Sequence, residues 1–547
     1  MAPHAATETT AITDTEGIPL PNPLTAKIPI NDILNRRAKA QQAQWGVAAP
    51  TSMDAFRINR QQQQEHKPKA KRWDHYLSHE TTSRTGSALK DAAKWLGTPG
   101  IISLGGGLPS SEYFPFASLS IKVPQAPFFS EAATAQSGTL LTAGKHDLAE
   151  GLSIFDIATA FNYGQGSGAA QLLRWISEHT ELVHEPGYAD WACTMTVGST
   201  AALDMLLRMF TRAGDVVVSE EYTFASAVDT MRPLGVRVAG VAVDAEGMLP
   251  AALDGLLEAW DPAAHAGARK PRVLYTVPSG QNPTGATQSG ARRAALYAVC
   301  RKHDVIVFED EPYYFLQMDP YSAGAEADTP AAAPASLAEF LDALVPSYLH
   351  LDTDGRVVRL DSFSKVLAPG TRIGWITGSE QIVGLFRKHA DLCTQGPSGV
   401  SQLMVFKLLD EHWGHGGYLA WLMHLRAEYT ARRNVILQAA EQHLPREVVQ
   451  WTPPMAGMFF WMGLDWKRHP DAASKSVMEI EEQVFMRSIE HGVLVMRGSW
   501  FRADADSEMT SLFFRATFAA APFDKIQEAI RRFGEAIRVE FGLVQTA

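Results

Sequence analysis

The chain has 547 residues, which is too long for one compact core, so two or more structural domains are expected. Apolar residues make up 46% and charged residues 20% of the sequence, a composition typical of ordinary globular proteins. The net charge of −11 disfavours a binder of nucleic acids or of anionic membrane surfaces, because both need a basic face.

The cysteines and the N-terminal region favour a cytoplasmic location. Cys193, Cys300 and Cys393 are far apart and lack metal-ligand spacing, so we expect core thiols in a reducing compartment and no metal site. No apolar run is long enough to predict a membrane span. The first residues lack the apolar segment of a signal peptide, and no arginine precedes Arg36, which disfavours a mitochondrial transit peptide.

Residues 1–80 are predicted to form a polar, partly disordered N-terminal arm with Pro-rich and Gln-rich stretches. Within this arm, residues 31–45 also have the composition of a helix. Residues 81–160 follow as an N-terminal segment that we assign to a small domain, and they include an irregular stretch at 123–153.

Residues 161–394 are predicted to form a large domain in which short apolar runs alternate with helical segments. The runs are rich in β-branched residues and mostly lack polar alternation, as expected of strands buried on both faces. They are CTMTV (193–197), DVVVSE (215–220), VRVAGVAVD (236–244), RVLYTV (272–277), VIVFED (305–310), VVRLDS (357–362) and RIGWITG (372–378). Repeated strand–helix–strand units predict an α/β fold with a mainly parallel sheet flanked by helices. An Ala/Pro-rich stretch at 319–345 is predicted to be a surface insertion.

Residues 395–547 are predicted to form a smaller α+β domain. A long amphipathic helix at 419–444 is followed by three short strand-like runs and a terminal helix at 523–541. The strand-like runs are GMFFWMGL (457–464), GVLVMRG (492–498) and LFFRATF (512–518).

Chemically distinctive residues follow five of the predicted strands. Because ligands of such sheets bind at the carboxyl ends of the strands, these residues are expected to share one cleft. They are Gly198, Ser199 and Thr200, then Tyr222 and Phe224, then Asn282, then Asp310, and finally Ser362, Ser364 and Lys365.

One part of this cleft is predicted to bind a phosphate. Ser199 and Thr200 open a predicted helix, whose free N–H groups and positive dipole end favour an anion. Ser362, Ser364 and Arg372 add two hydroxyl groups and a cation that can donate two parallel hydrogen bonds.

Asp310 and Lys365 are ionisable residues where the chain is expected to be buried. An unpaired carboxylate is costly to bury, so Asp310 needs a cation or a strong donor. Burial lowers the pKa of a lysine, and a neutral amine can form a Schiff base. Either residue alone could belong to an ordinary ion pair. Taken with the phosphate end, an aldehyde for Lys365 and a ring nitrogen for Asp310 fit pyridoxal 5′-phosphate (PLP).

Three motifs carry a resemblance to a known family. NPTG (282–285), DEPYY (310–314) and SFSKVLAPGTRIGW (362–375) closely resemble the class I and II aminotransferases of PLP fold type I. Their order and spacing are most similar to the branch that contains kynurenine/2-aminoadipate and fungal aromatic aminotransferases. The similarity covers roughly residues 80–540 and implies a large domain with a seven-stranded type of sheet and a smaller α+β domain.

The resemblance implies roles for individual residues. It makes Lys365 the Schiff-base lysine and the group that moves a proton, and Asp310 the partner of the pyridinium nitrogen. Asn282 and Tyr313 would bind the phenolic oxygen of the cofactor ring, and Arg515 would bind the α-carboxylate of the substrate. The phosphate would be held by Ser199, Thr200, Ser362, Ser364 and Arg372.

Other implied contacts involve the ring face, the substrate and a second subunit. Tyr163 would reach the phosphate from the other subunit, which predicts a homodimer with shared active sites. Phe224 stands where many relatives stack a tyrosine on the ring. A loop at 101–115 resembles the substrate loop and places Gly107 and Leu108 near the substrate. Lys90 stands loosely where close relatives carry an arginine.

The resemblance implies a transaminase that moves the amino group of an L-amino acid to a 2-oxo acid such as 2-oxoglutarate by a ping-pong mechanism. The branch favours aromatic donors (Trp, Tyr or Phe), in amino-acid metabolism or in a fungal specialised-metabolite pathway. A 2-aminoadipate or kynurenine aminotransferase and a PLP-dependent lyase or synthase remain as alternatives. A PLP-binding transcriptional regulator is disfavoured because residues 1–80 do not resemble a basic winged helix. A dehydrogenase is disfavoured because no convincing strand precedes the Gly-rich stretch at 164–168.

Overall fold

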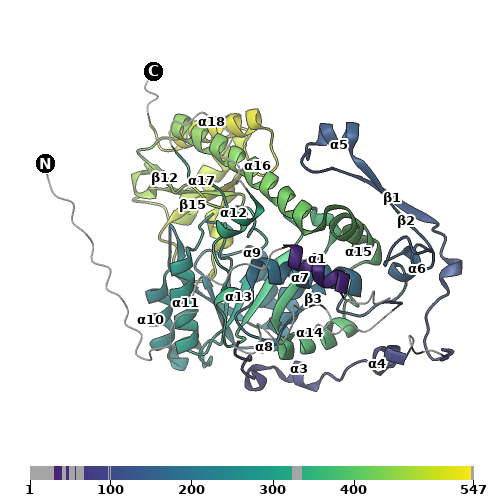
Figure 1. Cartoon of the computed structure of the whole chain (residues 1–547). Coiled ribbons are helices and arrows are strands. Elements are labelled where there is room, and N and C mark those ends of the chain that lie inside the picture. Colours follow the sequence, from purple (N-terminus) through teal and green to yellow (C-terminus); the bar gives the residue numbers. More distant parts are fainter. Residues whose placement is uncertain are drawn as a thin grey trace.

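The computed structural model describes residues 30–39, 45–47, 56, 67–95, 98, 100–322 and 336–543. Most of the predicted arm and the middle of the predicted insertion therefore lie outside the described residues. Two larger sheets organise the described chain, one of seven strands and one of four (Figure 1). Among the helices that the structure describes, none combines the length and hydropathy that a membrane span requires.

The seven-stranded sheet has the strand order β3-β11-β10-β9-β8-β4-β5. Its strands are β3 (Trp191–Thr196), β4 (Val216–Glu220), β5 (Arg237–Val241), β8 (Val273–Thr276), β9 (Ile306–Asp310), β10 (Val357–Ser362) and β11 (Gly374–Ser379). Strand β11 runs antiparallel to both of its neighbours, and the other pairs are parallel. Every residue of β9 and β10 is buried, which explains why these runs lack polar alternation. The predicted mainly parallel sheet is confirmed.

Helices flank this sheet, as the strand–helix alternation predicted. They are α7 (Ala170–His184), α8 (Gly198–Phe210), α9 (Ala225–Met231), α10 (Pro250–Glu258), α11 (Gly290–Lys302), α13 (Tyr348–Leu351) and α14 (Glu380–Leu392). Their apolar faces are buried in the core; on α8 these include Leu203, Leu206 and Leu207. The first turn of α8 follows the end of β3 directly, which places the start of the helix at the carboxyl edge of the sheet.

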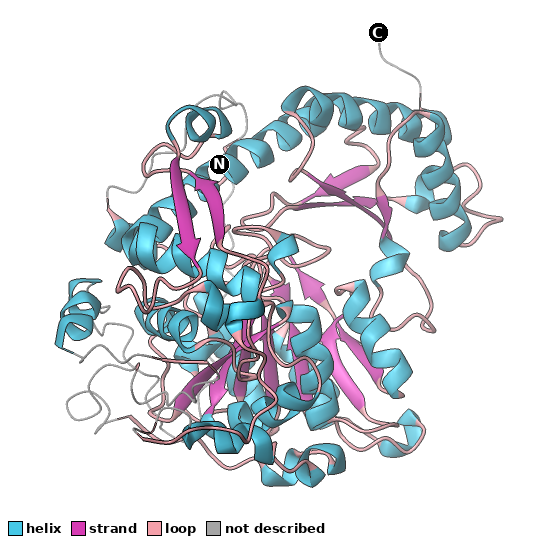
Figure 2. Cartoon of the chain, turned by 90° about the vertical axis from the view of Figure 1, so that its right-hand side faces the viewer, coloured by secondary structure: helices cyan, strands magenta, loops and turns pink. Residues whose placement is uncertain are grey.

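The second sheet is antiparallel and has the order β12-β13-β15-β14. Its strands are β12 (Val449–Trp451), β13 (Phe459–Leu464), β14 (Met496–Arg497) and β15 (Leu512–Thr517). The helices α16 (Gly414–His443), α17 (Val477–Glu490) and α18 (Phe523–Glu540) accompany it. Figure 2 shows this sheet at the upper right, apart from the larger sheet. Arg515 on β15 pairs with Trp461 on β13 in this sheet.

A hairpin with a helical tip lies within the stretch that was predicted to be irregular. Strand β1 (Ser118–Val123) pairs antiparallel with β2 (Thr139–Gly144), and α5 (Glu131–Ser137) lies between them. The buried Phe129 packs against Trp413 and Trp421 at ring-centroid distances of 5.9 and 5.4 Å. The alternating sequence SLSIKV at 118–123 is a strand signal that the sequence analysis did not use.

Residues 67–83 pack along the amino ends of the large sheet, although residues 67–80 belong to the predicted polar arm. Trp73 is fully buried, and its Nε1 donates a 2.9 Å hydrogen bond to the Gly355 carbonyl just before β10. The Arg356 guanidinium lies 5.1 Å from the Trp73 ring centroid. Nearby, the Ala70 N–H donates to Asp190 Oδ1 just before β3, at 2.7 Å.

The remaining described helices connect these units. They are α1 (Ile30–Lys39), α3 (His79–Ser83), α4 (Ala88–Ala92), α6 (Ile157–Ala160), α12 (Leu337–Asp342) and α15 (Gly399–Phe406). Helix α12 lies in the predicted surface insertion at 319–345, yet Phe340 and Leu341 on it are buried. The described end of that stretch therefore contributes to the core.

Candidate active site

A cavity of about 410 Å³ lies at the carboxyl ends of the large-sheet strands. It is lined by Ser199, Thr200, Phe224, Asn282, Asp310, Tyr313, Ser362, Ser364, Lys365, Arg372 and Arg515 from the sequence analysis. It is also lined by Leu203, Tyr275, Val277, Pro312, Pro369, Met458 and Phe459, which the sequence analysis did not select. The structure thus brings together side chains that lie more than 300 residues apart in the sequence, from Ser199 to Arg515.

The start of α8 forms one end of the cavity. Ser199 Oγ is buried and has no hydrogen-bond partner among the described residues. Gly198 has φ +78°, and a Cβ there would lie 2.4 Å from Arg372 Nη2, so glycine is required for the guanidinium to come this close. Ser362 Oγ donates to Ser364 Oγ at 2.7 Å in the same region. Free hydroxyls, a helix N-terminus and a guanidinium are the donors that a phosphate needs.

Arg372 is held against this end by the backbone. Its Nη1 donates to the Pro369 carbonyl at 2.9 Å, and its Nη2 donates to the Val197 carbonyl at 3.3 Å. Arg372 itself has φ +53°, a left-handed conformation that residues other than glycine rarely adopt. Such conformations gather at ligand sites, because the surrounding structure must hold them.

Asp310 is the last residue of β9 and lines the same cavity. Its Oδ2 accepts a 2.8 Å hydrogen bond from the Tyr275 hydroxyl, while its buried Oδ1 has no partner among the described residues. Burial raises the pKa of Asp310 to about 6. A protonated ring nitrogen at Oδ1 would satisfy the acceptor and favour the charged carboxylate, so this residue fits the pyridinium end of PLP.

Charged residues of β9 and β10 surround Asp310. Arg359 donates to Glu309 Oε1 at 3.0 Å and to Asp361 Oδ1 at 2.9 Å, and all three side chains are buried. Arg293 on α11 donates to Glu311 Oε1 at 3.1 Å. The negative charge of Asp361 raises the pKa of Asp310 and the positive charge of Arg359 lowers it, so this network acts on the carboxylate electrostatically. These ion pairs were not predicted from the sequence.

Lys365 lies in the turn that follows β10 and is partly buried. Burial, and then the positive charge of Arg515, lowers the pKa of its amine. The Trp421 Nε1–H donates to the Val366 carbonyl at 2.6 Å, which ties this turn to α16. A larger neutral fraction makes the amine a better nucleophile and base.

Arg515 reaches the cavity from the small sheet. Its Nη1 donates to Asn282 Oδ1 at 2.7 Å, while its buried Nε has no partner among the described residues. The guanidinium lies 4.5 Å from the ring centroids of both Phe459 and Phe501. Tyr313 lies nearby, and burial raises the pKa of its phenol, so the hydroxyl stays protonated and can donate. A guanidinium held between two rings with a free donor is suited to bind a carboxylate.

Three predicted site residues lie elsewhere in the chain. Tyr163 is 60% exposed and lines a separate depression of about 180 Å³. Gly107 is exposed and Leu108 is half-buried. Asn162 Nδ2 donates to the Pro109 carbonyl at 3.0 Å, so Tyr163 and the predicted substrate loop are neighbours. Their implied roles therefore remain predictions.

Lys90 is engaged in an ion pair on the surface of the large domain. Its Nζ lies 2.8 Å from Asp391 Oδ1 and ties α4 to α14. Both side chains are only 17% exposed. This contact gives Lys90 a structural partner within the chain.

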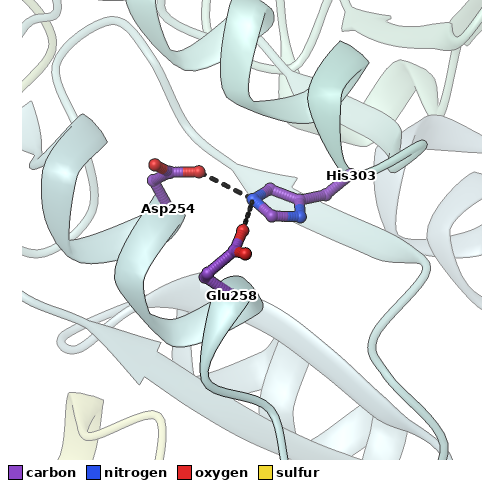
Figure 3. Close-up of side chains that lie close together, drawn as sticks. All are labelled: Asp254, Glu258 and His303. Carbon is purple, nitrogen blue, oxygen red and sulfur yellow. Dashed lines mark hydrogen bonds and ion pairs between the residues drawn. The ribbon is translucent and has the colours of Figure 1, made fainter.

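A second cluster of ionisable groups lies on α10 and at the C-terminal end of α11, which His303 follows directly (Figure 3). His303 Nε2 is 2.7 Å from Asp254 Oδ1 and 3.8 Å from Glu258 Oε2. Lys302 Nζ lies 2.9 Å from the Asp254 carboxylate and 3.3 Å from the Glu258 carboxylate. Because a lysine already supplies positive charge to both carboxylates, the cluster is explained as a surface ion-pair network.

Known proteins match this chain over most of its length. The profile of the family described as "Aminotransferase class I and II" matches residues 134–533. An aromatic amino acid aminotransferase of Schizosaccharomyces pombe is 42% identical over 470 residues, which are 85% of this chain and 98% of that protein. An L-tyrosine:2-oxoglutarate aminotransferase of Serpula lacrymans is 32% identical over 399 residues, which are 72% of this chain and 75% of that protein. The solved structure of the aminotransferase Aro8 of Candida albicans has a TM-score of 0.81 and 40% identity, over 87% of this chain and 100% of that one.

Proposed function

The chain belongs to the class I and II aminotransferases, which depend on PLP, and we propose that it transfers the amino group of an aromatic L-amino acid to 2-oxoglutarate. The observation that carries this proposal is the cavity, which has unpaired hydrogen-bonding atoms at three separate points. Ser199 Oγ and the start of α8 offer donors to a phosphate, Asp310 Oδ1 offers an acceptor, and Arg515 Nε offers a donor to a carboxylate.

PLP supplies an aldehyde that condenses with amines and a ring that accepts electrons. The residues proposed to hold its phosphate are Ser199, Thr200, Ser362, Ser364 and Arg372. Asp310 is proposed to keep the ring nitrogen protonated, because an ionised carboxylate favours a positive partner. Phe224 is proposed to stack on the ring, and Asn282 and Tyr313 are proposed to donate to its phenolic oxygen.

Lys365 and Arg515 are proposed to act directly on the substrate. Arg515 would bind the α-carboxylate and fix the orientation of the Cα–H bond. Lys365 would take the proton from the substrate Cα and return it to the aldehyde carbon of the cofactor, which receives the amino group. The lowered pKa of Lys365 increases the fraction of neutral amine available for this step. Both side chains are partly buried, which would limit the access of water to the proton transfer.

An aromatic donor is favoured over one with a distal carboxylate. Met458 and Phe459 give one wall of the cavity an apolar surface next to Arg515. Lys90 is already paired with Asp391, which disfavours its use as a receptor for a second carboxylate. The names of the fungal relatives agree with an aromatic donor, and one of them names 2-oxoglutarate as the acceptor.

A homodimer is proposed to complete each active site. Leu104 is 95% exposed and Tyr113 is 82% exposed in the single chain, within the same segment as Gly107. Tyr163, also exposed, lies beside this segment. Covering such side chains with a second copy removes apolar surface from water and would bring Tyr163 to the phosphate of the other site.

The domain division and the location are also proposals. The large sheet spans 191–379 and the small sheet 449–517, which supports a large domain at 161–394 and a small domain at 395–547. Residues 81–160 are proposed to be part of the small domain. Cys193, Cys300 and Cys393 are all free thiols, which supports a reducing compartment such as the cytoplasm.

The test uses the purified protein loaded with PLP, which should be yellow. Amino acids are added one at a time with 2-oxoglutarate, while the colour and the 2-oxo acid product are measured. Aromatic amino acids should bleach the colour and yield their 2-oxo acids fastest. Preference for 2-aminoadipate or kynurenine would replace the proposed donor, and a product other than a 2-oxo acid would favour a lyase. Lys365→Ala is the control, which should retain PLP non-covalently and lose turnover.

A further inference from the structure

Tyr275 is a fully buried residue on β8 that lines the cavity. Strands β8 and β9 are parallel neighbours, and in their register Tyr275 pairs with Phe308, two residues before Asp310. The Tyr275 hydroxyl therefore reaches Asp310 Oδ2 across the strand pair, at 2.8 Å. Asp310 Oδ1 remains without a partner among the described residues.

We propose that Tyr275 is a positioning residue for the cofactor: its hydroxyl holds the Asp310 carboxylate at Oδ2 and so leaves Oδ1 for the pyridinium nitrogen. A carboxylate held at one oxygen no longer has to be ordered when the ring binds. The proposal rests on the proposed function, because it assumes PLP in this cavity. It concerns cofactor binding, however, and can be tested without amino transfer.

Burial and nearby negative charges keep the Tyr275 hydroxyl protonated, so that it can donate a hydrogen bond. Burial, together with the negative charges of Asp310 and Glu220, raises the pKa of the Tyr275 phenol well above its ordinary value. The phenol is therefore protonated at neutral pH. Its hydrogen bond favours the ionised form of Asp310, as Arg359 does, whereas burial and Asp361 favour the neutral form.

A purely structural role is the competing explanation, because a buried tyrosine hydroxyl needs a partner wherever it lies. The chain contains a second buried tyrosine–aspartate pair, which lies outside the cavity and serves as a structural control. The Tyr297 hydroxyl donates to Asp352 Oδ1 at 2.9 Å, and burial raises the pKa of that aspartate to about 6 as well. Neither Tyr297 nor Asp352 lines the cavity, so Tyr297→Phe controls for the general cost of removing a buried phenol hydroxyl.

The experiment compares the apoenzymes of wild type, Tyr275→Phe and Tyr297→Phe. PLP is titrated into each from pH 5 to pH 8, and binding is followed by absorbance and by thermal stability. Tyr275→Phe should bind PLP about tenfold more weakly, the effect of losing one hydrogen bond to a charged group. Because the lost donor favoured ionised Asp310, the pH below which binding weakens should also move upward. Tyr297→Phe should lower the thermal stability and leave both PLP measurements unchanged.

Wild-type affinity and pH dependence in Tyr275→Phe would overturn the proposal. Tyr275→Gln, which retains a donor, is the second variant and should bind PLP more tightly than Tyr275→Phe. An equal loss in both variants would mean that the shape of the side chain matters rather than its hydrogen bond, and this also overturns the proposal. If Tyr275→Phe does not fold, the PLP affinity of Tyr275→Gln is compared with that of wild type. A tenfold weaker affinity of Tyr275→Gln would then contradict the proposal. A wild-type protein that binds PLP but transfers no amino group would refute the function and leave this comparison intact.

Discussion

Asp310 and Asp352 are both buried carboxylates next to β10, and burial raises the pKa of each to about 6. Their surroundings differ. Asp352 Oδ1 accepts from the Tyr297 hydroxyl and from the backbone N–H groups of residues 354, 355 and 356, and its Oδ2 accepts from the Val357 N–H. Asp310 has the Tyr275 hydroxyl at one oxygen and no partner among the described residues at the other.

The difference separates a structural carboxylate from one that is proposed to bind a ligand. Burial and a raised pKa are common to both residues and therefore do not distinguish them. The unpaired acceptor in the cavity does, because a buried polar atom usually has a partner and a ligand can reach this one. Both oxygens of Asp352 accept hydrogen bonds from donors within the chain. Asp310 Oδ1 would accept one only from a donor that enters the cavity.

The largest expected effect comes from exchanging each aspartate for its amide. Asp310→Asn should lower kcat by roughly a thousandfold, because an amide does not stabilise a protonated ring nitrogen. Asp352→Asn should keep kcat and lose about 2 kcal/mol of unfolding free energy, because the amide nitrogen faces N–H groups. Steady-state kinetics and denaturant unfolding measure the two effects. A loss of activity in folded Asp352→Asn would abolish the distinction.

The same contrast extends to two arginines, the buried Arg356 and the partly buried Arg515. Arg356 Nη1 and Nη2 donate to the Val305 carbonyl and to Asp354, whereas Arg515 Nε has no partner among the described residues. Arg515→Lys should lower kcat/KM about a hundredfold, because a lysine does not form the paired hydrogen bonds to a carboxylate. Arg356→Lys should lower the melting temperature and leave kcat/KM close to wild type. Equal kinetic losses in both variants would contradict the assignment of Arg515.

The affinity for PLP should fall as the pH is lowered, because Asp310 becomes protonated. The cofactor is expected to bind the ionised carboxylate, whose pKa in the free protein is about 6. Binding is therefore full above this pH and should weaken about tenfold for each further pH unit below it. PLP titration of the apoenzyme measures the effect, and Asp352→Asn should show the same profile as wild type. An unchanged affinity down to pH 4.5 would contradict the role of Asp310.

The smallest expected effect concerns Tyr297. Tyr297→Phe should lower the unfolding free energy by about 1 kcal/mol, the net value of a typical hydrogen bond. The hydroxyl favours ionised Asp352, so the loss should be larger above pH 6, where this carboxylate is charged, than below it. Urea unfolding at pH 5 and pH 8 measures the difference. An equal loss at pH 5 and pH 8 would mean that Asp352 is already ionised at pH 5, and would contradict this prediction.

Much of the fold could be predicted because six of the seven strands in the large sheet, all except the edge strand β5, are buried on both faces and lack alternation. The hairpin at 118–144 was not predicted, because its strands are half-exposed and lie outside the strand–helix alternation that identified the large sheet. Most cavity residues could be predicted because they lie in compact motifs directly after strands. Tyr275 could not, since it stands inside an apolar run, and its hydrogen bond depends on the pairing of β8 with β9.

The packing of residues 67–83 could not be predicted either, because polar composition dominates the neighbouring stretch. Trp73 and Tyr76 are buried, and their partners lie more than 200 residues away in the sequence. Such partners become visible only when the strand order is known. Composition alone therefore placed the start of the folded region too late in the chain.

The position of Trp73 matters for anyone who shortens this protein. Its indole binds the backbone at the amino end of β10, while Lys365, which is proposed to act in catalysis, follows the carboxyl end of the same strand. Deleting the chain up to residue 80 would expose the Gly355 carbonyl and the face of Arg356 to solvent without touching the cavity. Truncated enzymes for crystallisation or biocatalysis should therefore begin before Lys67.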